Sequence, residues 1–274
     1  MPVPSTESSS SAKQQQVPDL HRLAREGQYG LLTQYLNTTD ASPEEIKRQV
    51  NTRDADQRTV LHWILSAPAS DGGGNSAGST SGANVLKMLI QLGAEVESRD
   101  ESGWTPLMSA ASAGSLDYVR LLLDSGASPT ATNTRGLTPL HYAASKGHTD
   151  VGRCLLEYGA EVNARDGAKQ TPLHRAASAG RDAFVKVLLQ PPTRLDGGSH
   201  EKTRVNPQDR LQNTPLHLAM DSGQGSTAVL LIEEGGADRE RTNEDGVVPE
   251  EVDGLGGQAQ MRVRSFVQSS CGPR

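Results

Sequence analysis

The chain repeats one six-residue motif at a nearly constant interval. The motif is T-P-L-H-x-A, in which x varies, and it or a close variant begins at Thr59, Thr105, Thr138, Thr171 and Thr214. Successive threonines are 46, 33, 33 and 43 residues apart, so the period is 33 residues, with 13 extra residues in one unit and 10 in another. A repeat of this kind requires a stack of similar small units instead of a single central core.

The residues of each unit predict two helices and a turn. A threonine hydroxyl can cap a helix, and a proline fits the position that follows the cap. The run YVRLLLDSGA at 118–127 predicts a second helix that a glycine, Gly126, terminates in the left-handed conformation. A polar stretch such as VNARD at 162–166 then predicts a β-turn, called the finger, that leads to the next unit.

A 33-residue period with T-P-L-H-x-A is typical of ankyrin repeats. The predicted fold class is therefore all-α, an ankyrin-repeat solenoid of about seven repeats, each with two antiparallel helices and a β-turn finger. Degraded units that begin near Asp19 and Asp245 are the first and last repeats and act as caps.

The positions of the repeats along the chain also predict its domain organisation. Residues 1–16 are polar and serine-rich, which predicts a disordered tail. Residues 17–270 are predicted to form one ankyrin-repeat domain. Insertions near 37–49, 68–84 and 191–204 are rich in Gly, Ser, Pro or charge and are predicted to be surface loops.

Composition excludes several classes of protein. Only 34% of the 274 residues are hydrophobic and 3% aromatic, so the core must be built mostly from Ala and Leu. No apolar stretch is long enough to span a membrane. The net charge of −6 argues against nucleic acids and anionic membranes as partners. The two cysteines, Cys154 and Cys271, are far apart and no signal peptide follows Met1, which favours a cytoplasmic and nuclear location.

The histidines do not indicate an enzyme. Five of the seven occupy the same position of the repeat, which predicts that they hydrogen-bond an adjacent turn. Cys154 is predicted to be a buried, inert thiol. The glycine-rich stretches at 72–74 and 254–257 lack the strand and helix of a phosphate loop. We therefore predict no catalytic residue, no metal and no cofactor.

Positions that the repeat leaves free to vary are the candidates for binding a partner. They lie in the fingers and on the first helices, which in this architecture line one concave surface. The predicted groove is acidic at first, with two tryptophans that need something to pack against, and basic from Arg135 onward. Solvated turn charges remain the alternative for any single residue. The candidates are Asp54, Asp56, Arg58, Trp63, Asp100, Glu101, Trp104, Ser112, Arg135, Tyr142, Lys146, Lys169, Arg175 and Arg210, with Asp221 at the far end.

Several stretches are more specific than a generic ankyrin repeat. Five stretches resemble the gankyrin family of seven-repeat proteins. They are DQRTVLHW (56–63), DESGWTPL (100–107), TPLHYAASK (138–146), TPLHRAASAG (171–180) and NTPLHLA (213–219). The resemblance covers about residues 17–252. The loop expansions and the tail depart from the compact form and suggest a fungal-type member.

The resemblance implies a function. Gankyrin-like proteins are assembly chaperones of the proteasome regulatory particle and hold the C-terminal helical domain of one AAA-ATPase subunit in the concave groove. Arg58, Trp104 and Lys146 match family positions on that face, and the chain is expected to be a monomer. A pocket-protein partner is not implied, because Leu218–Ser222 lacks the Cys and Glu of L-x-C-x-E.

Two other functions would use ankyrin repeats differently. An inhibitory ankyrin adaptor that sequesters a cyclin-dependent kinase or a transcription factor would need the same fold, and it remains open. An enzyme with accessory repeats fails on length, because the residues outside the repeats are too few for a catalytic domain.

Overall fold

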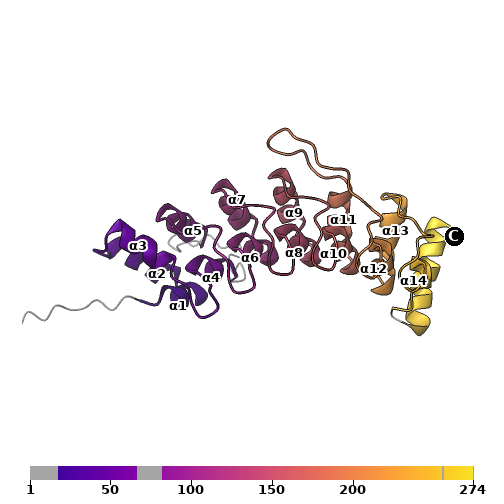
Figure 1. Ribbon diagram of the computed structural model, residues 1–274, viewed down its shortest axis with the longest axis horizontal. Coiled ribbons are helices and arrows are strands. Elements are labelled where there is room, and N and C mark those ends of the chain that lie inside the picture. The colour runs from indigo at the N-terminus through magenta and orange to yellow at the C-terminus, as the bar shows by residue number, and fades with distance from the viewer. Residues whose placement is uncertain (1–17, 67–81, 255, 274) are drawn as a thin grey trace, which may run out of the picture.

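The helices stack in two parallel rows (Figure 1). The computed structural model describes residues 18–66, 82–254 and 256–273, and this part of the chain contains helices but no β-strand. The predicted solenoid of helix pairs is thus confirmed. The first helices are α1 (Leu20–Arg25), α4 (Val60–Ser66), α6 (Pro106–Ala113), α8 (Pro139–Lys146), α10 (Pro172–Ser178) and α12 (Pro215–Asp221). The second helices are α2 (Tyr29–Thr38), α5 (Gly82–Gln91), α7 (Leu116–Asp124), α9 (Thr149–Glu157), α11 (Asp182–Leu189) and α13 (Gly225–Glu233).

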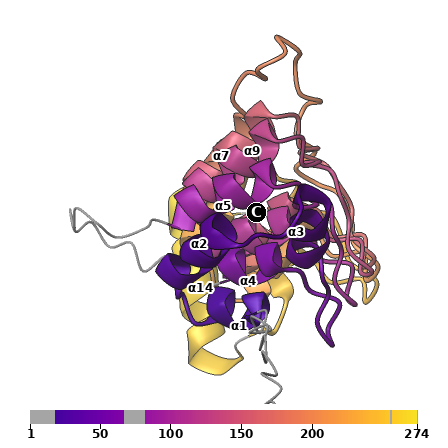
Figure 2. The same cartoon turned by 90° about the vertical axis from the view of Figure 1, so that its left-hand side faces the viewer.

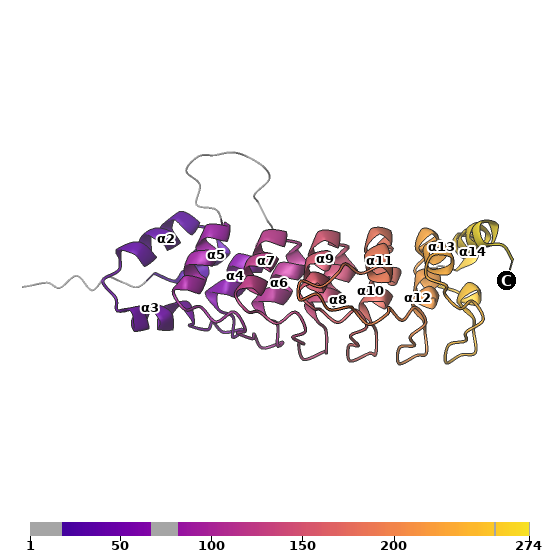
Figure 3. The ribbon, with the colours of Figure 1, turned by 90° about the horizontal axis from the view of Figure 1, so that it is seen from above.

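The fingers project from one side of the two helix rows, as the end-on and top views show (Figures 2 and 3). An aspartate or asparagine begins each turn: Asp54 Oδ1, for example, accepts the backbone N–H groups of Asp56 and Arg58, both at 2.9 Å. Neighbouring fingers are also joined to each other, as where the Gly167 N–H donates to the Arg135 carbonyl at 2.8 Å. The fingers therefore form a continuous wall beside the first helices.

The predicted helix signals act as expected. Thr105 and Thr214 side chains accept the backbone N–H groups of Met108 and His217. The second helices α5, α7, α9 and α13 are each followed by a glycine with positive φ, among them Gly126 at 91°, whereas α2 and α11 are not.

The repeated histidine ties a unit to the next in every repeat that has it, which excludes the third, where Met108 stands at this position. In His141, Nδ1 accepts the Thr138 backbone N–H at 3.1 Å, so Nε2 carries the proton and donates to the Gln170 carbonyl of the next finger at 3.1 Å. The other members of this set, called the latch histidines, make the same kind of bond to the following finger, which confirms their structural role: they are His21, His62, His174 and His217.

The core is continuous along the stack and consists mainly of Leu, Ala and Val. Phe184 is the largest fully buried side chain, and its ring lies so close to Gly152 on the preceding second helix that a Cβ there would be 2.5 Å from it. Small residues at such positions allow the helices to approach closely, as the composition required. No described helix has both the length and the apolar character needed to cross a membrane.

The predicted loop at 37–49 is wrong, because an additional helix, α3 (Pro43–Val50), occupies most of it. Ser42 caps this helix by accepting the Glu45 N–H, and Ile46 and Val50 are buried against the solenoid. The helix lies on the same side as the fingers (Figure 3). Its S-P-E-E start is a helix signal that the charge-rich composition concealed.

The two other insertions differ from each other. Residues 191–204 contain no helix or strand, as predicted, and the segment rises beyond α9 and α11 (Figure 1). Its Leu195 N–H donates to the Glu157 carbonyl at 2.8 Å. Most of 68–84 lies outside the described residues, as does the predicted tail at 1–16. Residues 82–84 belong to α5 and not to a loop, so that boundary was wrong.

The last repeat is reduced. Its first helix is a single 3-10 turn, η1 (Pro249–Glu251), and its second is the longer helix α14 (Gly257–Cys271), which packs on α13. Because Glu250 in η1 is paired with Arg239 at 2.6 Å, this end of the stack is closed partly by a buried ion pair.

Candidate functional site

One position on each first helix faces the groove between the helices and the fingers. It follows the latch histidine and is occupied by Trp63, Ser109, Tyr142, Arg175 and Leu218 in successive repeats. In three repeats its side chain bonds to the residue that begins the finger of the same unit: Trp63 to Asp54 at 2.7 Å, Tyr142 to Asn133 at 2.8 Å, and Arg175 to Asp166 at 2.5 Å. The groove surface is thus built from a regular scaffold with variable side chains.

The first part of the groove is organised around Trp63. The guanidinium carbons of Arg25 and Arg58 lie 5.4 and 5.0 Å from the centroid of its ring, within range of cation–π attraction. Arg58 also reaches Asp100 of the next finger at 3.5 Å. Trp63 therefore has packing partners within the chain, although the indole remains partly exposed.

The middle of the groove holds an aromatic pair. The rings of Trp104 and Tyr142 lie 4.3 Å apart at 45°, which joins the third and fourth repeats. They line a hollow of about 340 Å³ together with Arg135, Lys146 and Arg175. Burial raises the pKa of Tyr142, so its hydroxyl is neutral and accepts from Asn133 at neutral pH. The second tryptophan is thus also packed within the chain.

An adjoining hollow of about 380 Å³ carries the basic character further along the groove. Arg135, Arg175 and Arg210 line it, with Asp166 as the only acidic group among its described lining residues. Burial by itself raises the pKa of Asp166, but hydrogen bonds from Arg175 and the backbone outweigh it and lower the pKa overall. Asp166 is therefore ionised and partly offsets one of the three arginines.

The acidic candidates have two different roles. Asp54 and Asp100 each accept two backbone N–H groups of their own finger and are partly buried, so they shape the turn and are not free for a partner. Asp56 and Glu101 are exposed at the finger tips. Treating all of them as one acidic binding surface was wrong.

The remaining candidates lie along the same face. Ser112 lines the central hollow, and its carbonyl accepts from His148 Nε2 at 3.1 Å. Lys146, Lys169 and Arg210 are exposed, and the backbone of Lys169 has a φ of 62°, a conformation in which other fingers place glycine.

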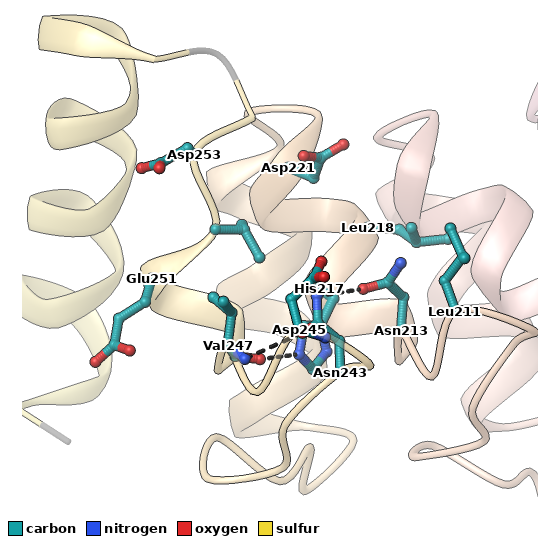
Figure 4. Close-up of a pocket in the computed structure, with 11 residues that line it drawn as sticks. Leu211, Asn213, His217, Leu218, Asp221, Asn243, Asp245, Val247, Glu251 and Asp253 are labelled. Atoms are coloured by element: carbon teal, nitrogen blue, oxygen red, sulfur yellow. Dashed lines mark hydrogen bonds between the residues drawn. The ribbon is translucent and has the colours of Figure 1, made fainter.

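The predicted charge order fails at the far end of the groove. A third hollow, of about 450 Å³, is lined by Leu211 and Leu218 and by acidic residues (Figure 4). Asp221 was a candidate, whereas three other acidic lining residues were missed because they belong to the degraded last repeat, where register is hardest to follow. These are Asp245, Glu251 and Asp253.

The chemistry of this face is that of a binding surface. No group of three or more metal-ligating side chains occurs in the described ranges. Burial lowers the pKa of His141 and of His174 to about 4, so both are neutral at physiological pH and fully occupied by their backbone bonds. Cys154 is buried, which raises the pKa of its thiol, as expected for an unreactive group.

A stack of helix pairs with a variable concave face defines a repeat scaffold for binding other proteins. The comparison with protein families agrees: the ankyrin repeats model (3 copies) matches residues 76–166 and 164–243. The chain belongs to the ankyrin-repeat family, whose members are generally non-catalytic binding scaffolds. No curated protein matches the chain.

Proposed function

We propose that the chain is a non-catalytic chaperone for assembly of the proteasome regulatory particle, which holds the C-terminal helical domain of a proteasomal AAA-ATPase subunit in its groove. The proposal is supported by the gankyrin-like stretches at 56–63, 100–107 and 138–146. The observation that carries it is that Arg58, Trp104 and Lys146, the residues of those stretches that match family positions, lie along a single groove face.

The proposed mechanism is steric and electrostatic. The basic middle of the groove, with Arg135, Lys146, Arg175 and Arg210, binds an acidic surface of the ATPase domain. A solenoid attached to that domain obstructs docking of the ATPase ring until assembly is complete. The chain acts as a monomer in the cytoplasm and nucleus.

Affinity purification of the tagged full-length chain, followed by mass spectrometry, tests the proposal. We expect ATPase-ring base subunits without intact, doubly capped proteasomes. A purification without any ATPase subunit would contradict the proposal, and one dominated by a kinase or a transcription factor would favour the inhibitory adaptor instead.

The groove is tested by a paired charge reversal, Lys146→Glu with Arg210→Glu. Both side chains are exposed in the groove, so the fold should be retained. Arg58 is a poorer choice, because a glutamate there would face Asp100 and the Trp63 ring. The matched control is Lys87→Glu with Arg153→Glu, two exposed cations on the second helices α5 and α9. ATPase capture should be lost in the first pair and kept in the second.

A further inference from the structure

The hollow at the C-terminal end of the groove has apolar side chains along one side, within a lining that also includes Asn213, His217 and Asn243. Leu218 of α12 and Val247 of the last finger line it, and Leu211 of the preceding finger stands at its edge with 60% of its surface exposed. Figure 4 shows the two leucines at one side of the hollow, with Glu251 and Asp253 at the other. Leu211 therefore adds exposed apolar surface to the edge of a concave hollow of about 450 Å³, and concave sites are where proteins bind ligands.

The rim of this hollow is acidic. Asp221 ends α12 and Asp245 lies at the tip of the last finger, and both are exposed. No described cation forms an ion pair with either of them, whereas Asp253 is paired with Arg264 at 3.3 Å. The negative charge at the rim therefore exceeds what the chain itself neutralises.

The repeat register shows that side-chain identity alone changes the polarity of the groove. Leu218 occupies the position that Arg175 has on α10, and Asp245 occupies the finger position that Arg135 has three fingers earlier. Equivalent positions thus carry cations in the middle of the groove and apolar or acidic groups at its end. A partner that lies along the whole groove therefore meets positive charge in the middle of the groove and negative charge at its C-terminal end.

We propose that the C-terminal hollow binds a basic amphipathic helix of the partner protein, in which leucine-like side chains pack against Leu211 and Leu218 and flanking Lys or Arg side chains pair with Asp221 and Asp245. This inference rests on the proposed use of the groove to hold a protein. The two leucines supply apolar contact area, and the acidic rim selects the sign of the flanking charges. Because the middle of the groove is basic, the hollow fixes the direction in which the partner lies.

Fluorescence anisotropy with three labelled helical peptides tests the inference on the full chain. The probe has leucines at i and i+4 flanked by lysines; one control replaces the lysines by glutamates and the other replaces the leucines by serines. We expect the probe to bind at least about tenfold more tightly than either control at low salt, and its affinity to fall as salt rises.

Protein variants locate the binding. The double variant Asp221→Lys with Asp245→Lys should bind the probe more weakly, by about tenfold or more. These changes suit the fold, because a cation is favourable at the C-terminal end of a helix and Arg135 already occupies the equivalent finger position. Lys87→Glu with Arg153→Glu, on the second helices and away from the hollow, should leave probe affinity unchanged.

The results separate this inference from the proposed function. Absence of probe binding, equal binding of the glutamate peptide, or no effect of the aspartate reversals in a folded variant would each overturn the hollow as a site for a basic helix. Failure to capture an ATPase subunit would instead overturn the chaperone proposal and leave peptide binding intact.

Discussion

The latch histidines predict that the solenoid loses stability in mild acid. His141 and His174 are each buried and neutral, with pKa values of about 4 compared with 6.5 in an unfolded chain. Between pH 6.5 and pH 4 the unfolded state therefore binds more protons than the folded state, and stability falls as the pH falls. Linkage gives a loss of about 2 kcal/mol for each histidine between pH 7 and pH 5, or about 4 kcal/mol for the pair.

The double variant His141→Met with His174→Met tests this magnitude. Methionine already occupies the latch position of the third repeat, at Met108, so the fold accommodates it. The variant should be less stable than the wild type at pH 7, by about 1 kcal/mol or more for each lost hydrogen-bonding side chain. Between pH 7 and pH 5, the free energy of unfolding of the variant should fall by about 4 kcal/mol less than that of the wild type.

Urea unfolding followed by circular dichroism at both pH values measures the difference. Met108→Leu is the matched control, because it changes the same position without removing a titratable group, and it should keep the full pH dependence. Burial also lowers the pKa of His62 and of His217, so some acid sensitivity should remain in the double variant. An unchanged pH dependence in the double variant would refute the assignment of these histidines as neutral latches.

Four further substitutions have expected outcomes in the same unfolding assay. Gln212→Gly should stabilise the fold by up to about 1 kcal/mol, because Gln212 has a φ of 58°, and the reverse change at the equivalent Gly246 should destabilise it. Equal effects of the two changes would contradict this. Phe184→Ala should cost about 3–5 kcal/mol by leaving a cavity in the core, and a loss below about 1 kcal/mol would show that the site collapses. Asp54→Ala should lower the free energy of unfolding by about 1–3 kcal/mol, because it removes the acceptor of two backbone N–H groups and of the Trp63 indole N–H. It should also shift the fluorescence of Trp63, and an unaltered spectrum would count against the contact between Asp54 and the indole.

The sequence predicts the repeated part of the fold because each unit carries the same local signals. Capping threonines, helix-ending glycines and latch histidines recur in register, so one interpretation applies to every copy. The failures fall where the register is broken. Helix α3 has its own capping serine but no counterpart in the other repeats, and η1 replaces a first helix where valine and proline stand in place of threonine and proline.

The candidate site was predictable as a face but not as a set of contacts. Period alone places Trp63, Tyr142 and Arg175 on the groove. It cannot show that Asp54 is occupied by turn hydrogen bonds, because that depends on the backbone of the finger. The acidic end was missed for a similar reason: Asp245 reaches the hollow only through the packing of the reduced last repeat on α12.

Hydrogen exchange of the full chain, free and with the protein that it captures, tests the central claim most directly. We predict slower exchange of backbone amides in the fingers and first helices, including residues 99–112, 133–146 and 166–175, with little change in α7, α9 and α11. Protection confined to the second helices, or spread evenly over both rows, would contradict the assignment of the groove as the binding surface.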